Sequence, residues 1–265
     1  MIEIPFTKFH GAENDFLLTW GDESPLMRLP QIARLICARN TGIGADGWML
    51  VWKEEHGLRT RLFNSDGSEP EISGNGTRCA AAFGLLKHAV APPEIVIATA
   101  AGSKSVRLIS HEGKRYTLEM NMGLPKAENI HATVHASGRD FDSALLNVGN
   151  PQCAVFVKQI PEDWEMAGRL IERHPMFPNR TNVSFVRVVD RHTIETVFFE
   201  RGAGATRSSG TGSTGAAAAA ILRGEADSPV EIRTPAGPMT LRWVESVYLT
   251  GPAELVGEGR FYADL

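Results

Sequence analysis

Two segments of the sequence place a serine and two glycines immediately before an alanine-rich stretch. They are Ser73-Gly-Asn-Gly76 and Ser209-Gly-Thr-Gly212. A glycine-rich turn that enters a helix leaves backbone N–H groups outside the helical ladder, at the positive end of the helix dipole. Such an end binds a carboxylate or a phosphate without a charged side chain. The serines are interpreted either as ordinary N-caps or as reactive groups at the same place.

The second segment also fits the GxGxxG pattern of dinucleotide sites, as Gly210-Thr-Gly-Ser-Thr-Gly215. Such a site requires the motif to follow directly on a strand. Here the expected strand ends at Glu200, nine residues before Ser209, and Cys79 stands where the first segment would need its third glycine. The pattern therefore does not predict a nucleotide site.

One offset of 136 residues relates the two segments and the polar landmarks before them. The same offset pairs Leu62-Phe63-Asn64 with Phe198-Phe199-Glu200, Asn14 with Asn150, and Asp46 with Asn182. Self-similarity at a fixed offset indicates a duplicated structural unit. The alternative is a chance alignment in a chain rich in glycine and alanine. Two paired serine–glycine turns could converge on one small anion.

The coarse pattern predicts two strand-rich halves, each with one buried helix. Strands are expected at the N-terminus and at 60–63, 94–98, 115–120, 154–157, 183–189, 194–199, 230–232, 239–243 and 246–250. Helices are expected at 29–39, 77–88, 164–173 and 213–223. The helices after the two turns are mostly alanine and glycine, so neighbours can approach them from all sides. We predict an α/β (α+β) fold of two pseudo-symmetric halves, each a mostly antiparallel sheet or barrel around a central helix.

The domain prediction is an N-terminal half over residues 1–125 and a C-terminal half over 126–265, with the active cleft between them. The final strands are free to pack back onto the N-terminal half. Gly123-Leu-Pro, near the middle of the chain, suits the first crossing between the halves.

Composition narrows the class of partner. A net charge of −4 offers no basic patch for nucleic acid. Apolar runs such as Ala216–Leu222 are far shorter than the roughly 20 residues that span a bilayer, and the N-terminus has no signal-peptide core. The three cysteines and the dispersed histidines show no metal-ligand spacing. We expect a cytoplasmic protein without nucleic-acid, membrane or metal partners.

Several motifs, read in order, carry a family resemblance. They are Phe6-Thr-Lys-Phe-His-Gly-Ala-Glu-Asn-Asp-Phe16, Phe63-Asn-Ser-Asp-Gly-Ser-Glu69, Ser73-Gly-Asn-Gly-Thr-Arg-Cys79, Gly149-Asn-Pro151, Arg180-Thr-Asn182 and Glu200-Arg-Gly-Ala-Gly204. Between about residue 6 and residue 220, the chain resembles the diaminopimelate epimerases. The resemblance implies two similar α/β halves, each a sheet or barrel around a central helix, with the substrate between them. It also implies chemistry without a cofactor on a small amino acid that carries two carboxylates; a homodimer is left open.

In that family, two cysteines work from opposite faces of the amino acid. One thiolate removes the α-proton and the other thiol delivers a proton to the far side. Carried over by motif, the resemblance assigns substrate binding to Asn14, Asn64, Asn150, Asn182, Glu200 and Arg201. It assigns the α-carboxylate to the amides of Gly74-Asn75 and Gly210-Thr211. A bidentate grip of Arg201 on the distal carboxylate and acceptance of an ammonium by Glu200 would complete the recognition.

The sequence departs from the family pattern where protons are transferred. The two family cysteines fall on Ser73 and Ser209, the histidine of the Gly-Asn-Pro-His motif is Gln152, and a glutamate is Ala205. A neutral serine is a poor base without a second base beside it. Glu200 is the main remaining carboxylate, with Asp15, Asp66 and Glu69 as further candidates. Cys79 and Cys153 are expected to pack in the core.

Three functional hypotheses follow. The first is epimerisation of LL- and meso-diaminopimelate, for lysine and cell-wall synthesis, with Ser73, Ser209 and Glu200 as catalytic groups. The second is a one-base isomerase, dehydratase or lyase acting on another amino acid, by analogy with related folds. The third is an amino-acid-binding homologue with impaired catalysis, and natural divergence explains its four changed positions better than engineering does.

Overall fold

The computed structural model describes residues 1–25 and 27–264, and it divides into two compact units. Unit 1 comprises Met1–Met120 and Gly251–Leu265, and unit 2 comprises Asn121–Thr250.

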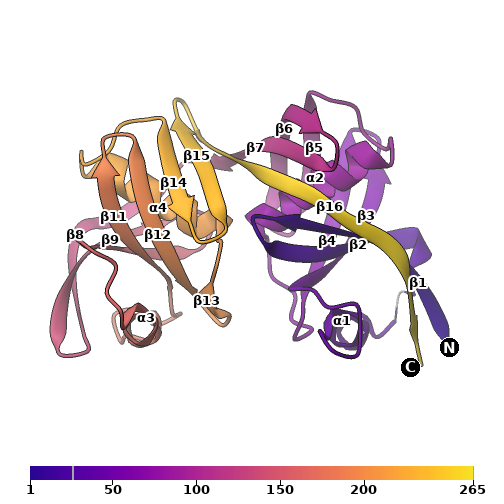
Figure 1. Cartoon of the computed structure of the whole chain (residues 1–265), viewed down its shortest axis with the longest axis horizontal. Coiled ribbons are helices and arrows are strands. Elements are labelled where there is room, and N and C mark those ends of the chain that lie inside the picture. The colour runs from indigo at the N-terminus through magenta and orange to yellow at the C-terminus, as the bar shows by residue number, and fades with distance from the viewer. Residues whose placement is uncertain (26, 265) are drawn as a thin grey trace. The chain divides into compact units, whose positions relative to one another are not determined.

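Eight strands form a closed ring in unit 1 (Figure 1). Their order is β1 (Ile2–Gly11), β2 (Asn14–Trp20), β3 (Gly47–Glu54), β4 (Gly57–Asn64), β5 (Glu94–Thr99), β6 (Gly102–Glu112), β7 (Arg115–Gly123) and β16 (Val247–Ala263). Pairing of β1 with β16 closes the ring, in an antiparallel register that places Ile2 opposite Ala263. Most neighbours are antiparallel, but β2–β3 and β4–β5 are parallel.

Helix α2 (Gly74–Leu86) is the central helix of unit 1. It packs against β1 to β5, and its residues from Gly74 to Gly84 are buried. A helix without a polar face is stable only where protein surrounds it. Small side chains such as Ala80, Ala81 and Ala82 let the strands approach closely on all sides.

Helix α1 (Leu29–Cys37) lies outside the ring, as Figure 1 shows, after the short 3-10 helix η1 (Gly21–Glu23). Its apolar face covers the outer side of β3 and β4, where Ile32 and Ile36 pack with Trp48 and Phe63. Unit 1 thus has one core within the ring and a second beneath α1.

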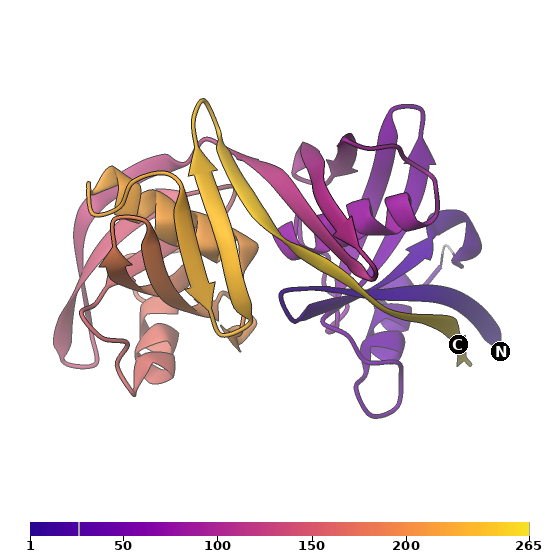
Figure 2. The same cartoon turned by 45° about the horizontal axis from the view of Figure 1, so that its top comes forward.

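Unit 2 repeats this arrangement. Its strands run in the order β8 (Lys126–Ala136), β9 (Arg139–Asn147), β10 (Pro151–Phe156), β11 (Asn182–Asp190), β12 (Thr193–Glu200), β14 (Val230–Thr234), β15 (Gly237–Trp243) and the start of β16, and β13 (Gly204–Thr206) pairs with β12. Figure 2 shows α4 (Gly210–Leu222) among these strands. Helix α3 (Trp164–Glu172) covers the outer side of β11, where Ile171 packs with Phe185.

The offset of 136 residues persists in the elements themselves. It relates both ends of α2 to those of α4, and both ends of β4 to those of β12. The predicted fold class, two similar halves each wrapped around a central helix, is therefore confirmed. The four predicted helices are present, but α2 and α4 begin three residues earlier than Thr77 and Ser213, at Gly74 and Gly210.

Candidate functional site

The two predicted serines are both N-caps of central helices. The Ser73 hydroxyl accepts a hydrogen bond from the amide of Gly76 at 3.1 Å, and Ser209 accepts from Gly212 at 3.0 Å. Each serine satisfies the third amide of its helix, and the first two amides lie outside the helical ladder. The early start of both helices therefore turns Gly74-Asn75 and Gly210-Thr211 into first-turn residues, at the positive end of the helix dipole.

A carboxylate distinguishes the two serines. Ser209 Oγ donates to Glu200 Oε2 at 2.8 Å, and Thr206 Oγ1 donates to the other oxygen of Glu200 at 2.8 Å. Glu200 ends β12, and the pairing of β12 with β13 brings Thr206 back beside it. In unit 1 the equivalent position is Asn64, whose amide donates instead to Ser68 Oγ at 2.9 Å. Ser209 thus has a base at hydrogen-bonding distance.

An asparagine contacts the first turn of the central helix in both units. In unit 1, Asn75 Nδ2 donates to Asn14 Oδ1 at 3.3 Å. In unit 2, Asn150 Nδ2 donates to Thr211 Oγ1, also at 3.3 Å. Both pairs are separated by 61 residues, so the duplication reproduces the contact with the direction of donation reversed.

Asn182, at the start of β11, and Arg201, directly after β12, are neighbours. Asn182 Oδ1 accepts from the Arg201 amide at 3.0 Å, and Asn182 Nδ2 donates to the carbonyl of Pro151 at 3.0 Å. The Arg201 side chain is exposed, and its Nη1 donates to the carbonyl of Asn179 at 3.2 Å. Within the described residues, this guanidinium has no carboxylate partner, so it is available to an anionic ligand.

The three further carboxylates considered from sequence are held by other partners. Burial raises the pKa of Asp15, but hydrogen bonds and charge from Arg39 and Lys8 outweigh it, so the pKa is lowered overall. Hydrogen bonds from Ser68 lower the pKa of Asp66, and those from Arg61 lower the pKa of Glu69. A carboxylate with a lowered pKa is a weaker base at neutral pH, so none of the three is a good substitute for Glu200.

The three cysteines lie in the cores. Cys37, Cys79 and Cys153 are at most 2 % exposed, and burial raises the pKa of each thiol to about 12. Thiolates are the reactive form of cysteine, and these thiols remain protonated at neutral pH. None of the three thiols is therefore suited to removing a proton.

Gln152 has a role that the sequence did not indicate. It is 2 % exposed, and its Nε2 donates to Asn150 Oδ1 at 2.6 Å. The absence of a side chain at Gly215 makes room for it, since a Cβ there would lie 2.9 Å from Gln152 Cγ. Gln152 therefore orients Asn150, whereas Ala205 is an exposed residue of β13.

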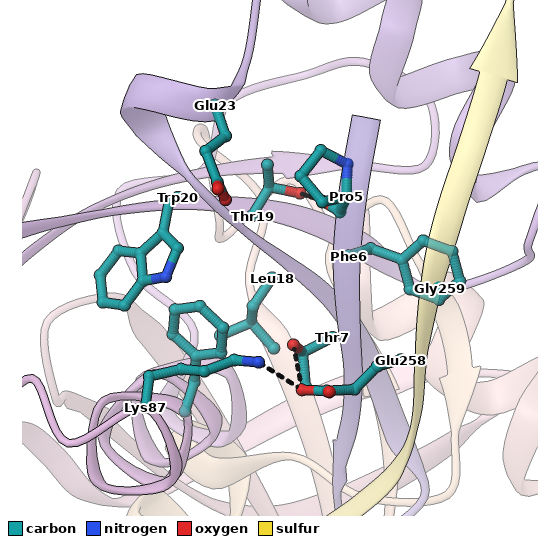
Figure 3. Close-up of a pocket in the computed structure, with 11 residues that line it drawn as sticks. Pro5, Phe6, Thr7, Leu18, Thr19, Trp20, Glu23, Lys87, Glu258 and Gly259 are labelled. Atoms are coloured by element: carbon teal, nitrogen blue, oxygen red, sulfur yellow. Dashed lines mark hydrogen bonds and ion pairs between the residues drawn. The ribbon is translucent and has the colours of Figure 1, made fainter. Parts of the chain in front are cut away.

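Unit 1 has two hollows, and one of them borders Ser73. Figure 3 shows one of about 250 Å³ between β1, β2, β16 and the C-terminal end of α2, where Lys87 Nζ meets Glu258 Oε1 at 2.6 Å. No predicted site residue lines it. A second hollow of about 30 Å³ lies beside Ser73 and Thr77, which is room for about one water molecule.

Comparison with known sequences relates the chain to a family. The family model described as diaminopimelate epimerase matches residues 6–127 and 144–256. The diaminopimelate epimerase of Moorella thermoacetica is 36% identical over 277 residues, which cover 98% of this chain and 99% of that protein. The chain belongs to the diaminopimelate epimerase family. Members of this family are isomerases, and the resemblance drawn from the motifs is confirmed.

Solved structures share the fold at low sequence identity. A phenazine biosynthesis protein of the PhzF family from Bacillus anthracis matches with a TM-score of 0.76 and 16% identity, over 98% of this chain and 99% of that one. A hydroxyproline epimerase from Agrobacterium vitis, bound to trans-4-hydroxy-L-proline, matches with a TM-score of 0.75 and 17% identity, over 97% and 92% of the two chains. Both likenesses concern the fold of this diaminopimelate epimerase family member.

The sequence predicts no segment that spans a membrane. Among the described residues, no helix has both the length and the apolar character that a membrane crossing requires.

Proposed function

We propose that this protein epimerises diaminopimelate, with Ser73 and Ser209 in place of the family's two catalytic cysteines. The observation that carries the proposal is the hydrogen bond of 2.8 Å from Ser209 to Glu200, at the mouth of a helix whose first-turn amides suit a carboxylate. Family membership supplies the class of reaction. The substrate and the serine pair are the parts that need a test.

The two serines would have unequal roles. Ser209 can accept the α-proton while its own hydroxyl proton passes to Glu200, because the two oxygens are already hydrogen-bonded. Among the described residues, the Ser73 hydroxyl accepts from Gly76 and has no carboxylate partner, so its hydrogen can be donated. We propose that Ser209 removes the α-proton from one stereoisomer, that Ser73 delivers its own hydroxyl proton to the opposite face of the α-carbon, and that water then returns a proton to Ser73 and takes one from Glu200.

The remaining predicted residues would hold the two ends of the substrate. The amides of Gly74-Asn75 and Gly210-Thr211 would take the α-carboxylate at the reacting carbon. Asn14, Asn64, Asn150 and Asn182 would supply neutral hydrogen bonds, and the exposed guanidinium of Arg201 would take the distal carboxylate. Glu200 would also lie near the substrate ammonium.

The deciding experiment is exchange of the α-proton. Purified protein is incubated with LL- or meso-diaminopimelate in deuterated water, and α-deuterium and the stereoisomer ratio are followed by NMR and chiral chromatography. We expect incorporation of deuterium together with inversion. No exchange at high enzyme loading, combined with normal calorimetric binding, would leave the protein as an amino-acid-binding homologue.

Restoring the cysteines tests the pocket separately. The double variant Ser73→Cys/Ser209→Cys should epimerise diaminopimelate faster than the natural protein, because a thiol is the stronger acid and its thiolate the better-populated base. Single variants serve as matched controls. A double variant without activity would show that the site is built for another substrate.

The inequality of the two serines also favours a second candidate. A site with one carboxylate-supported base suits a one-base isomerase, dehydratase or lyase acting on another amino acid. A panel of hydroxylated and unsaturated amino acids distinguishes the two. Loss of water or migration of a double bond, without exchange of diaminopimelate, would replace the first proposal by this one.

A further inference from the structure

A chain of four side chains runs behind the N-terminus of α2. Arg78 Nη2 donates to Asn75 Oδ1 at 2.5 Å, and Asn75 Nδ2 donates to Asn14 Oδ1 at 3.3 Å. Asn14 Nδ2 then donates to Asp46 Oδ2 at 2.7 Å. All four residues belong to unit 1. The side-chain amides of Asn75 and Asn14 thus lie between a guanidinium at one end and a carboxylate at the other.

The two ends fix the direction of every hydrogen bond between them. A guanidinium has only donors, so the oxygen of Asn75 must face Arg78. A carboxylate has only acceptors, so the NH₂ group of Asn14 must face Asp46. Rotating either amide by half a turn would set donor against donor or acceptor against acceptor. Neither amide can therefore flip while both charges are in place.

Both ends are themselves anchored. Arg78 is fully buried, its Nε donates to the carbonyl of Pro252 at 3.4 Å, and it lies against Gly251, where a Cβ would come within 3.0 Å of the guanidinium carbon. Burial lowers the pKa of Arg78 to about 10, which leaves it charged at neutral pH. At the other end, Asp46 accepts from Arg39 at 2.8 Å and from the amide of Asp15 at 3.1 Å.

Unit 2 lacks both charges. Gln152 and Thr211 end its chain through Asn150, and the hydroxyl of Thr211 can donate or accept. The residue equivalent to Arg78 is Thr214, which donates to the carbonyl of Gly210 at 2.8 Å. Asn182 stands in the place of Asp46. A fixed direction is therefore a property of unit 1.

We propose that Arg78 and Asp46 are positioning residues that fix Asn14 as a hydrogen-bond donor towards the substrate. Among the described residues, Asn14 uses its oxygen for Asn75 and one amide hydrogen for Asp46, which leaves the second amide hydrogen for a ligand. An acceptor such as a carboxylate oxygen matches that hydrogen, whereas the NH₂ group of a carboxamide does not. The inference rests on the proposed function for the contact between Asn14 and the substrate.

The orientation of the amides is tested first without any ligand. Side-chain ¹⁵N–¹H signals of Asn14 and Asn75 are assigned with the variants Asn14→Ala and Asn75→Ala, and exchange of their hydrogens with water is measured. Asp46→Asn removes the anion with almost no change in shape, and we expect at least tenfold faster exchange at Asn14. The control Asp142→Asn removes an exposed carboxylate paired with Arg223. Unchanged exchange in Asp46→Asn would overturn the proposal.

Specificity is tested next by calorimetry with meso-diaminopimelate and its mono-α-carboxamide. The natural protein should prefer the dicarboxylate, and Asp46→Asn should lower that preference about tenfold, the value of one hydrogen bond. Arg78→Lys keeps a cation with donors only and should retain the preference better than Arg78→Met. A preference unchanged in Asp46→Asn would overturn the proposed role of the charges.

The two proposals fail in different ways. If neither probe binds the natural protein, the proposed substrate is wrong, and the exchange measurement alone decides whether Arg78 and Asp46 orient the amides. If both probes bind and the exchange of the Asn14 amide hydrogens is unaltered in Asp46→Asn, the proposed substrate keeps its support and the positioning role falls. Circular dichroism of each variant separates either result from unfolding.

Discussion

Ser73 and Ser209 have the same place in the repeat but different neighbours. Each caps a helix through the amide three residues later. In the part of the chain that the structure describes, Ser209 alone of the two also donates to a carboxylate, Glu200, since the matching position in unit 1 is Asn64. At the scale of single residues, the duplication therefore kept the structural role of the serine and altered its acid–base surroundings.

This difference predicts unequal effects of removing the two hydroxyls. Ser209→Ala should lose both α-proton exchange and inversion, by about a hundredfold or more, because it removes the base and its link to Glu200. Ser73→Ala should lose inversion but keep exchange from one stereoisomer of diaminopimelate. The measurement is NMR of α-deuterium together with chiral chromatography.

Each serine variant is the matched control for the other in its free energy of unfolding. Each loses one N-cap, so both should unfold with about 1 kcal/mol less free energy. Equal losses of exchange in the two variants would contradict unequal roles for the serines.

Glycine and alanine allow both central helices to be buried among the strands. In α4 every residue from Gly210 to Ala220 is buried, and in α2 the same holds from Gly74 to Gly84. Small side chains leave little free volume between helix and strands. The helices can therefore present their first-turn amides at a defined place without a polar face of their own.

Close packing predicts that an enlarged helix will not fit. Ala218→Leu adds three carbons at a position with no exposed surface, and we expect a loss of about 1 to 3 kcal/mol in the free energy of unfolding. Ala127→Leu, on the exposed side of β8, should change stability by less than about 0.5 kcal/mol. Chemical denaturation measures both, and equal stability of the two variants would contradict close packing around α4.

The start of β2 predicts a pH dependence. Lys8 and Arg39 lower the pKa of Asp15 below its ordinary value of 3.8, although burial alone would raise it. A lowered folded-state pKa means that the stabilisation is complete above pH 3.8 and is lost as the pH falls through the folded-state pKa.

Replacing the Asp15 carboxylate tests the direction of this pH dependence. Asp15→Asn should be less stable at pH 7 by on the order of 2 kcal/mol, because Lys8 loses its carboxylate partner and Arg39 keeps only Asp46. The gap to the natural protein should shrink below about pH 4, as measured by denaturation across pH. A gap that is constant from pH 7 to pH 3 would contradict the ion pairs as its cause.

The whole molecule depends on contacts between the ends of the chain. Residues 251–265 belong to the same unit as the first 120 residues. Phe261 on β16 is paired with Ile4 on β1 and packs in the core beneath α1. The last strand is therefore part of the first unit's fold.

Adjacent residues of β16 make this testable. Phe261→Ala should destabilise the protein by about 3 kcal/mol or more, because Phe261 is 9 % exposed within a core. Tyr262→Ala, at 52 % exposure, should cost much less. Thermal unfolding followed by near-ultraviolet circular dichroism compares them, and similar losses would contradict a core role for the C-terminal strand.

The sequence by itself determined the duplication, the four helices, the family and the candidate residues. These depend on local patterns: the offset of 136 residues, the alanine-rich runs, and motifs such as Gly149-Asn-Pro151. The sequence analysis did not predict β2, β3, β6, β8, β9 or β13. The exposed positions of β8 carry mostly polar side chains, which weakens its strand pattern. The last predicted strand ended at Thr250, whereas β16 continues to Ala263. Pro252, Gly257 and Gly259 weaken the local signal there, and pairing with β1 overrides it.

Only the tertiary structure decided which residues act on one another. Glu200 and Ser209 meet because β13 folds back along β12, and Arg78 reaches Pro252, 174 residues away in sequence, because β16 closes the ring. A hydrogen bond forms only within a few tenths of an ångström of its preferred donor–acceptor distance. The spacing of residues in a sequence does not specify distances to that precision. For that reason the sequence could name Ser73 and Ser209 as a pair, whereas the structure was needed to show that their surroundings differ.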